Sequence, residues 1–290
     1  MRRADDRPIF RFAPSPNGFL HLGHAYSALI NQQLAREAGG QMLLRIEDID
    51  VARCTPALEA AMEEDLRWIG FEWEAEPRRQ SEHFEDYRAA LDVLVEAGLA
   101  YRSTLSRGDI RAFVAEKEAT GTAWPRDPDG APLFPGRAYE AVDGDAVAWR
   151  LDVAAAKAHL GIETVAWEEL GQGPEGESGL VEADPAQWGD FVLARRDVPT
   201  SYHLSVVVDD ALQGISDVVR GRDLFAATSA HALLQDLLGY GRPRYFHHDL
   251  ILEPGETRKL SKSRDDTSLR ALRQAGVTAG DVRRMIGFEA

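Results

Sequence analysis

Residues 11–24, "RFAPSPNGFLHLGH", contain the clearest indication of the fold class. This stretch begins within a segment, residues 9–16, whose apolar start and terminal prolines predict a short buried strand. Residues 17–40 then predict a glycine turn followed by a helix, because apolar residues recur at helical spacing until Gly39. A strand that passes through a glycine turn into a helix is typical of the first unit of an α/β fold.

The elements that follow repeat this alternation. Residues 41–50 predict a second strand with acidic residues at its carboxyl end. Residues 55–71 predict a helix that Thr55 caps, with a proline in its first turn, and residues 81–101 predict another amphipathic helix. The order strand, helix, strand, helix predicts a parallel sheet covered by helices.

The middle of the chain differs in composition. Residues 121–147 and 171–187 are rich in Gly, Pro and Asp, so we interpret residues 102–188 as an irregular insertion with a few strands, among them 146–153. Regular structure is expected to resume after the insertion. The expected elements are strands at 189–197 and 201–212, a strand and turn at 215–224, a helix at 225–241 and a strand at 244–252.

Composition excludes several classes of protein. The net charge of the 290 residues is −15, which argues against indiscriminate nucleic-acid binding. No run of 18 apolar residues indicates a membrane span, and the amino terminus has no apolar core of a secretory signal. Cys54 is the only cysteine, which excludes an intramolecular disulfide and a multi-cysteine metal site. A cytoplasmic protein is the simplest expectation.

The turn "HLGH", residues 21–24, is the first candidate site. It places His21 and His24 at a helix start, where free backbone N–H groups favour anions. Either imidazole can donate to a phosphate, and Gly23 permits close approach of a purine or a phosphate. In isolation the two histidines are equally consistent with helix capping or packing.

The second candidate is the loop "RKLSKSRDD", residues 258–266. Lys259 and Lys262 flank Ser261, and these groups can neutralise and hydrogen-bond a triphosphate. Such cations stabilise the charge that develops on a departing pyrophosphate. Taken alone, the loop is better explained as an ordinary solvated turn.

Together, the two motifs resemble the paired signatures of class I aminoacyl-tRNA synthetases, and residues 11–24 are similar to the glutamyl branch in particular. The resemblance extends in order through four further motifs, which are "LLRIEDID" (43–50), "GDFVLARRD" (189–197), "YHLSVVVDD" (202–210) and "VVRGRDL" (218–224). It implies a Rossmann-like α/β catalytic domain. We expect its halves at 1–101 and 189–252, the insertion at 102–188, and the lysine loop with two short helices at 253–290.

The resemblance also implies a glutamate site. Arg11 and Arg220 provide planar forks suited to carboxylates, and Glu47 can pair with the ammonium group. Tyr202 and Ser15 offer neutral hydrogen bonds. The full expected set is Arg11, Phe12, Ala13, Pro14, Ser15, Glu47, Tyr202 and Arg220. A structural ion pair is the alternative for Arg11 or Glu47 taken singly. We interpret Asp209 and Asp210 as groups that support the site or face a ribose, with helix capping as the alternative.

The implied reaction is adenylation of L-glutamate by ATP, which is the co-substrate, with magnesium. A carboxylate is already ionised at pH 7, so no general base is required. The resemblance assigns catalysis to His21, His24 and Lys262. ATP binding is expected from the same three residues and from Gly23, Lys259 and Ser261.

The acceptor is inferred from length. The 27 residues after Ser263 suffice for two short helices and not for the anticodon-binding domain of a full glutamyl-tRNA synthetase. The chain therefore resembles the truncated paralogues, the glutamyl-Q tRNA(Asp) synthetases, whose acceptor is queuosine in the anticodon loop of tRNA(Asp). His24 departs from this branch, which often has serine there. A monomer that binds no membrane is expected.

Three other functions stay open. A compact glutamyl-tRNA synthetase would charge a tRNA 3′ end, and a non-catalytic paralogue would only bind glutamate and ATP. A nucleotidyltransferase shares the "HxGH" chemistry, but it has no need of the Arg, Glu and Tyr set.

A second departure concerns metal. Many family members hold zinc in the insertion through cysteines, and the aligned positions here are Ser103, Leu105, Phe134 and Ala138. None of these supplies a thiolate, so we predict no zinc. We expect packing alone to hold the insertion, with Trp124, Phe134 and Trp149 as contributors.

Overall fold

The computed structural model describes residues 7–141, 147–251 and 267–288. Its centre is a seven-stranded sheet in the order β3-β2-β1-β9-β10-β6-β7, in which every neighbouring pair is parallel except β6 with β7. The strands are β1 (Ile9–Phe12), β2 (Gln41–Ile46), β3 (Arg78–Arg79), β6 (Val165–Glu169), β7 (Gly179–Ala183), β9 (Asp217–Gly221) and β10 (Arg244–His248). The α/β class with a mostly parallel sheet is therefore confirmed.

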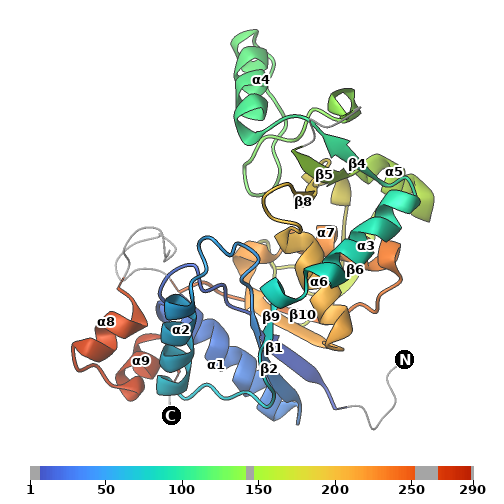
Figure 1. Cartoon of the computed structure of the whole chain (residues 1–290). Coiled ribbons are helices and arrows are strands. Elements are labelled where there is room, and N and C mark those ends of the chain that lie inside the picture. The colour runs from blue at the N-terminus through green and yellow to red at the C-terminus, as the bar shows by residue number, and fades with distance from the viewer. Residues whose placement is uncertain (1–6, 142–146, 252–266, 289–290) are drawn as a thin grey trace.

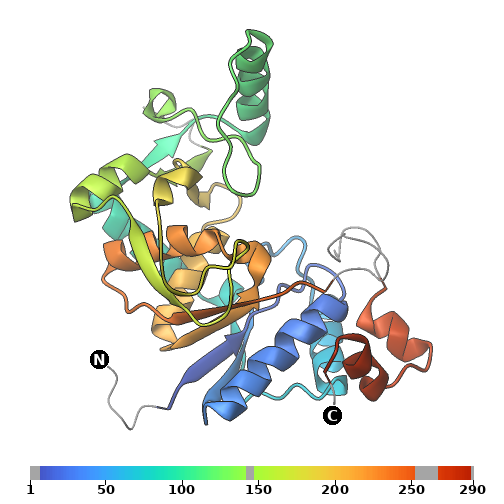
Figure 2. The ribbon, with the colours of Figure 1, turned by 180° about the vertical axis from the view of Figure 1, so that it is seen from behind.

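Helices cover both faces of this sheet (Figure 1, Figure 2). On one side α1 (Leu22–Glu37) packs on β1 and β2, with α2 (Pro56–Trp68), α8 (Leu269–Gln274) and α9 (Ala279–Met285) around it. On the other side lie α3 (Phe84–Glu96), α6 (Tyr202–Leu212) and α7 (Ala227–Leu238). No helix in the described ranges is both long and apolar enough to cross a membrane.

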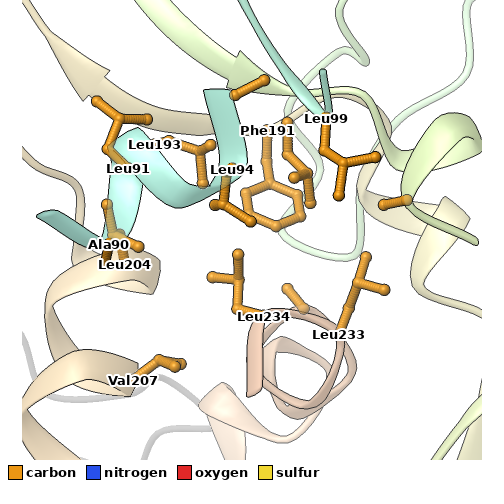
Figure 3. Packing of buried hydrophobic residues seen from close by; sticks show 14 of the residues in the cluster. Ala90, Leu91, Leu94, Leu99, Phe191, Leu193, Leu204, Val207, Leu233 and Leu234 are labelled. Carbon is orange, nitrogen blue, oxygen red and sulfur yellow. The ribbon is translucent and has the colours of Figure 1, made fainter. Parts of the chain in front are cut away.

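The second face of the sheet has a continuous apolar core. Figure 3 shows the Phe191 ring between side chains of α3 and α7, close to Leu94, Leu233 and Leu234. Tyr87 and Leu94 of α3 are fully buried in the same cluster. Burial of an aromatic or leucine side chain contributes roughly 1.5–3 kcal/mol, so this cluster anchors α6 and α7 against the rest of the chain.

Residues 201–212 were expected to form a strand, and this prediction is wrong. They form α6, whose N-cap Ser201 accepts a hydrogen bond from the Leu204 N–H. Every residue from Leu204 to Asp210 is buried, because the helix is enclosed on all sides. A helix without a polar face has no 3.6-residue pattern, and its three valines favour a strand by propensity alone.

The interval 102–188 contains more regular structure than expected. It includes the unpredicted helices α4 (Arg107–Ala119) and α5 (Val153–Leu160), and a small antiparallel sheet joins β4 (Ala100–Ser103), β5 (Ala148–Leu151) and β8 (Val192–Arg195). This part projects away from the central sheet in both views (Figure 1, Figure 2). β6 and β7, by contrast, extend the central sheet although they lie within residues 102–188. The expected boundaries of the insertion therefore differ from the division of the strands between the two sheets.

We predicted that packing alone holds the insertion, and this prediction is wrong. Trp124 does pack edge-on against Phe113, with ring centroids 5.0 Å apart. A buried arginine adds polar contacts: the Arg150 guanidinium lies 3.8 Å from the Phe134 ring centre, and its Nε donates to Ser103 Oγ at 3.1 Å. An arginine therefore links Ser103 and Phe134, two of the four positions at which the sequence predicts no zinc ligand.

Candidate functional site

A cavity of about 590 Å³ opens at the carboxyl ends of β1, β2 and β9. Ligands of open α/β sheets bind at this edge. All the described residues that the sequence assigned to the glutamate and ATP sites line this one cavity: Arg11, Phe12, Ala13, Pro14, Ser15, His21, Gly23, His24, Glu47, Tyr202 and Arg220. The fold thus brings together side chains more than 200 positions apart in the sequence.

Strand pleating explains which side chains face which helices. Phe10 and Phe12 of β1 pack in the core under α1, so Arg11 faces the opposite side, toward α6. The same alternation places Arg45 of β2 and Arg220 of β9 on the α6 and α7 side. The three arginines therefore lie on the same face of the sheet because side chains alternate between the two faces along each strand.

The two histidines of the "HLGH" turn cap α1, which was the alternative interpretation of these residues. Nδ1 of His21 accepts from the Gly23 N–H at 3.1 Å, and Nδ1 of His24 accepts from the His21 N–H at 3.2 Å. Because both caps use Nδ1, the neutral rings carry their proton on Nε2. Nε2–H is then the group through which either ring would donate to a phosphate.

Gly23 is required for a second reason. A Cβ at this position would lie 3.0 Å from Cε1 of His21, closer than ordinary van der Waals contact. A side chain here would displace the His21 ring, which is 9% exposed at the cavity. The glycine therefore maintains the geometry of the turn as well as access for a ligand.

Arg11 is held by a buried ion pair that the sequence did not reveal. Its Nε donates to Asp210 Oδ1 at 2.9 Å, and Arg45 Nη1 donates to the same oxygen at 2.7 Å. Burial alone would raise the pKa of Asp210, but the charges of Arg11 and Arg45 outweigh it and lower that pKa below its ordinary value. The carboxylate is therefore ionised and fixes both guanidinium groups.

Glu47 lies where β2 leaves the sheet, and its side chain is 13% exposed. Arg45 Nη2 donates to it over 3.4 Å, a long contact. Burial raises the pKa of Glu47 despite the nearby arginines. A desolvated carboxylate that lines a cavity is stabilised by an incoming cation, such as an ammonium group.

Asp209 supports the site from behind. It accepts from Arg78 at 2.7 Å, from Gln80 at 2.8 Å and from the Tyr87 hydroxyl at 2.9 Å. It is absent from the cavity lining, so it does not face a ribose there. Its role is to tie α6 to β3 and α3.

Arg220 is surrounded by neutral acceptors. Its Nε donates to His247 Nε2 at 3.1 Å, Nη1 to His231 Nδ1 at 3.1 Å, and Nη2 to Thr228 Oγ1 at 2.8 Å. Within the described ranges no carboxylate contacts Arg220 directly. Its charge is therefore available to an anion in the cavity.

Sequence reasoning missed Asp223, Ser27 and His248 among the lining residues, and His231 and His247 behind them, whereas Asp210 supports the site as one of its two interpretations proposed. In the structure His247 and His248 end β10, but the sequence predicted a strand that continues to residue 252, so no signal marked these two residues as the carboxyl end of a strand. Nothing in the sequence pairs Arg220 with a histidine on α7.

The lysine loop with Lys259, Ser261 and Lys262 lies outside the described residues. The described positions on either side of it reach the site. Ile251 lines the cavity, and Ser268 forms an isolated antiparallel bridge with His21. The described residues that flank the loop in the sequence, Ile251 and Ser268, thus lie at the cavity and at the "HLGH" turn.

The described ranges contain no group of three His, Cys, Asp or Glu side chains that could hold a metal ion. Magnesium that acts on ATP is bound mostly through phosphates and water, with one or two carboxylates, so it needs no protein cage. Asp223 lines the cavity and is the kind of ligand that such an ion would accept.

We expect the purified protein to contain well under one zinc per chain by elemental analysis. None of the four positions expected to hold zinc has a thiolate, since they are Ser103, Leu105, Phe134 and Ala138. Protein expressed with added zinc and then dialysed is the control. Zinc near one equivalent per chain would contradict the prediction.

The chain is similar to known proteins over most of its length. Residues 9–287 match the family model described as tRNA synthetases class I (E and Q), catalytic domain. The chain is 44% identical to a glutamyl-Q tRNA(Asp) synthetase of Rhodobacter capsulatus, over 97% of this chain and 100% of that protein. It is 38% identical to a glutamate–tRNA ligase of Prochlorococcus marinus, over 93% of this chain and 55% of that protein.

The fold has solved counterparts. A glutamate-tRNA synthetase from Elizabethkingia anophelis superposes with a TM-score of 0.70 at 24% identity, over 93% of this chain and 54% of that one. At this identity the likeness establishes the fold. The family model spans nearly the whole chain, and the curated relatives share well over a third of its residues. The chain therefore belongs to the glutamyl and glutaminyl group of class I tRNA synthetases, a family of ligases that use ATP as a substrate.

Proposed function

We propose that this enzyme activates L-glutamate with ATP and transfers it to the queuosine base in the anticodon loop of tRNA(Asp), as a monomer in the cytoplasm. The observation that carries the activation step is the convergence of Arg11, Glu47, Tyr202 and Arg220 in one cavity beside the "HLGH" helix start. The match to a glutamyl-Q tRNA(Asp) synthetase over that protein's whole length supports the acceptor.

The cavity chemistry fits glutamate. Glutamate carries two carboxylates and one ammonium group, and the cavity offers two guanidinium groups and one desolvated carboxylate. Charge-assisted hydrogen bonds of this kind are roughly twice as strong as neutral ones. We assign Arg11 and Arg220 to the carboxylates, Glu47 to the ammonium group, and Tyr202 and Ser15 to neutral hydrogen bonds. Phe12, Ala13 and Pro14 line the glutamate site between Arg11 and Ser15.

The first step requires that glutamate and ATP are positioned for reaction and that the charge on the leaving pyrophosphate is stabilised. An oxygen of the glutamate α-carboxylate attacks the α-phosphorus of ATP, and the bond to pyrophosphate breaks in line, which leaves glutamyl-adenylate. In this proposal His21 and His24 donate to phosphate through Nε2, and Lys259, Ser261 and Lys262 stabilise the leaving pyrophosphate with magnesium. Gly23 leaves room for the nucleotide.

The second step needs a nucleophile from RNA. A hydroxyl of the queuosine cyclopentene diol attacks the acyl carbon of the adenylate and an ester forms. AMP leaves with the bonding electron pair, and the hydroxyl proton passes to its phosphate or to solvent. Exposed bases of single-stranded loops are the usual targets of sequence-specific RNA recognition, which suits an anticodon loop. The 38% identity to a glutamate–tRNA ligase favours transfer to a tRNA 3′ end as the second candidate.

The acceptor is tested with radiolabelled glutamate, ATP and two bulk tRNA samples, one that contains queuosine and one that lacks it. We expect label only on the sample with queuosine, and we expect it to persist when the 3′-terminal CCA sequence is first removed with an exonuclease. Failure of a known glutamyl-tRNA synthetase to charge the trimmed tRNA is the control for complete removal of the 3′ end.

The other outcomes identify the rivals. Label on both samples that removal of the tRNA 3′ end abolishes would make the enzyme a compact glutamyl-tRNA synthetase. No label, together with no glutamate-dependent exchange of pyrophosphate into ATP, would favour a non-catalytic binding protein. Exchange without label would leave the activation step correct and the queuosine acceptor wrong.

A further inference from the structure

The hydrogen-bond roles around Arg220 are fixed by its chemistry. A guanidinium group has five N–H donors and no acceptor. His231 Nδ1, His247 Nε2 and Thr228 Oγ1 must therefore all accept from it. Three donors are used in this way, and Nη1 and Nη2 each keep one further N–H. These two are the donors that a ligand carboxylate can accept from.

The acceptor roles determine the tautomers. His247 accepts on Nε2, so its proton is on Nδ1, which donates to Glu169 Oε2 at 2.6 Å. His231 accepts on Nδ1, so its proton is on Nε2, which donates to His203 Nδ1 at 3.2 Å. Two chains of hydrogen bonds thus end on Arg220, one from β6 and one from α6.

Both histidines are neutral at physiological pH. Burial, and then the charge of Arg220, lowers the pKa of His231 well below its ordinary value. Burial lowers the pKa of His247 to about 4, although Glu169 acts in the opposite direction. If either ring were protonated, its new N–H would face an N–H of Arg220 and the two positive charges would repel. The charge of Arg220 therefore keeps both rings neutral.

The contrast with Arg11 shows what neutral partners achieve. Asp210 contacts Arg11 directly and neutralises much of its charge, whereas the carboxylate of Glu169 is separated from Arg220 by the His247 ring. A carboxylate in direct contact with Arg220 would compete with the substrate carboxylate. Imidazole and hydroxyl acceptors orient the fork without this competition.

We propose that His231, His247 and Thr228 are positioning residues that orient Arg220 by neutral hydrogen bonds, and that this makes the cavity prefer a carboxylate over a carboxamide. The inference rests on the proposed function and deepens it. It assigns the preference for glutamate over glutamine to the neutrality of the groups behind Arg220 as well as to Arg220 itself.

The test uses two variants that differ by one charge. Asn and Asp have the same shape, and each places an oxygen where His231 has Nδ1, so H231N keeps a neutral acceptor and H231D adds a carboxylate. Glutamate-dependent exchange of pyrophosphate into ATP gives KM values for glutamate and ATP, and glutamine is assayed in parallel. Activity of the wild-type protein with glutamate tests the proposed function separately.

We expect H231N to stay within about threefold of the wild-type KM for glutamate, because it keeps the neutral acceptor. In H231D that KM should rise about 30-fold or more, with an unchanged KM for ATP and a lower ratio of glutamate to glutamine activity. Thermal unfolding of both variants controls for stability, since a merely structural role would change both KM values together.

A third variant covers the case in which H231D does not fold. T228V conserves shape and removes one acceptor, and we expect it to raise the KM for glutamate roughly threefold to tenfold without changing that for ATP. Equal glutamate KM values in H231N and H231D would overturn the inference. If H231D does not fold, a wild-type glutamate KM in T228V would do so.

Discussion

Replacement of Arg220 by alanine is expected to raise the KM for glutamate by about 10²–10³-fold and to leave the KM for ATP nearly unchanged. Arg220 is buried at the cavity and no described carboxylate neutralises it, so a bound substrate carboxylate would be its direct counter-ion. Loss of one partner from such a desolvated pair costs roughly 2–5 kcal/mol, and each 1.4 kcal/mol is about tenfold in affinity. Steady-state pyrophosphate exchange with varied glutamate measures the effect.

Arg244→Ala is the matched control for this experiment. Arg244 stands at the start of the adjacent strand β10, away from the cavity, and pairs with Asp217 at 2.6 Å. We expect its glutamate KM to match that of the wild type. A glutamate KM in R220A that equals the Arg244→Ala value would remove Arg220 from substrate binding, and a parallel rise in the ATP KM would indicate a general structural defect.

Replacement of Asp210 by asparagine should lower the free energy of unfolding by about 3–5 kcal/mol. Asp210 is 7% exposed and is shared by Arg11 and Arg45, which are 5% and 0% exposed. The neutral amide would leave two buried guanidinium groups with one carboxylate fewer between them. Denaturant unfolding followed by fluorescence measures the change, which is a large fraction of a typical stability of roughly 5–15 kcal/mol.

The effect should also depend on pH with a defined sign. The pKa of Asp210 is lowered in the folded protein, so its contribution is complete above the ordinary aspartate pKa and is lost as the pH falls through the folded value. The stability difference between wild type and D210N should therefore be full at pH 7 and should shrink in acid. Asp92→Asn, on the exposed face of α3, is the control and should change stability by less than about 0.5 kcal/mol. An equal loss in both variants would contradict the role of Asp210.

Local sequence patterns correctly predicted the helices and strands that begin or end at a capping residue, a proline or a glycine. The "HLGH" helix, the Thr55-capped helix and the strands at 9–16, 41–50 and 244–252 all exist close to the expected positions. Capping residues, prolines and terminal glycines act within a few residues of the chain, and a sequence displays them directly.

Residues 201–212 illustrate why other elements could not be predicted. Their burial on every side removes the polar face that reveals a helix, and three consecutive valines indicate a strand. Contacts with α3 and α7 override that preference. Because α6 carries Tyr202, Asp209 and Asp210, the error also concealed how Arg11 and Arg45 are neutralised.

Local pattern was enough to predict the α/β class, the family resemblance and the motif residues that line the cavity, since these residues lie at strand ends and helix starts that a sequence displays. Only the tertiary structure decided which charges are compensated. Asp210 reaches Arg11 across 199 positions, and neutral histidines from α7 and β10 reach Arg220. Electrostatic interaction depends on distance and burial in space, and a linear sequence contains neither.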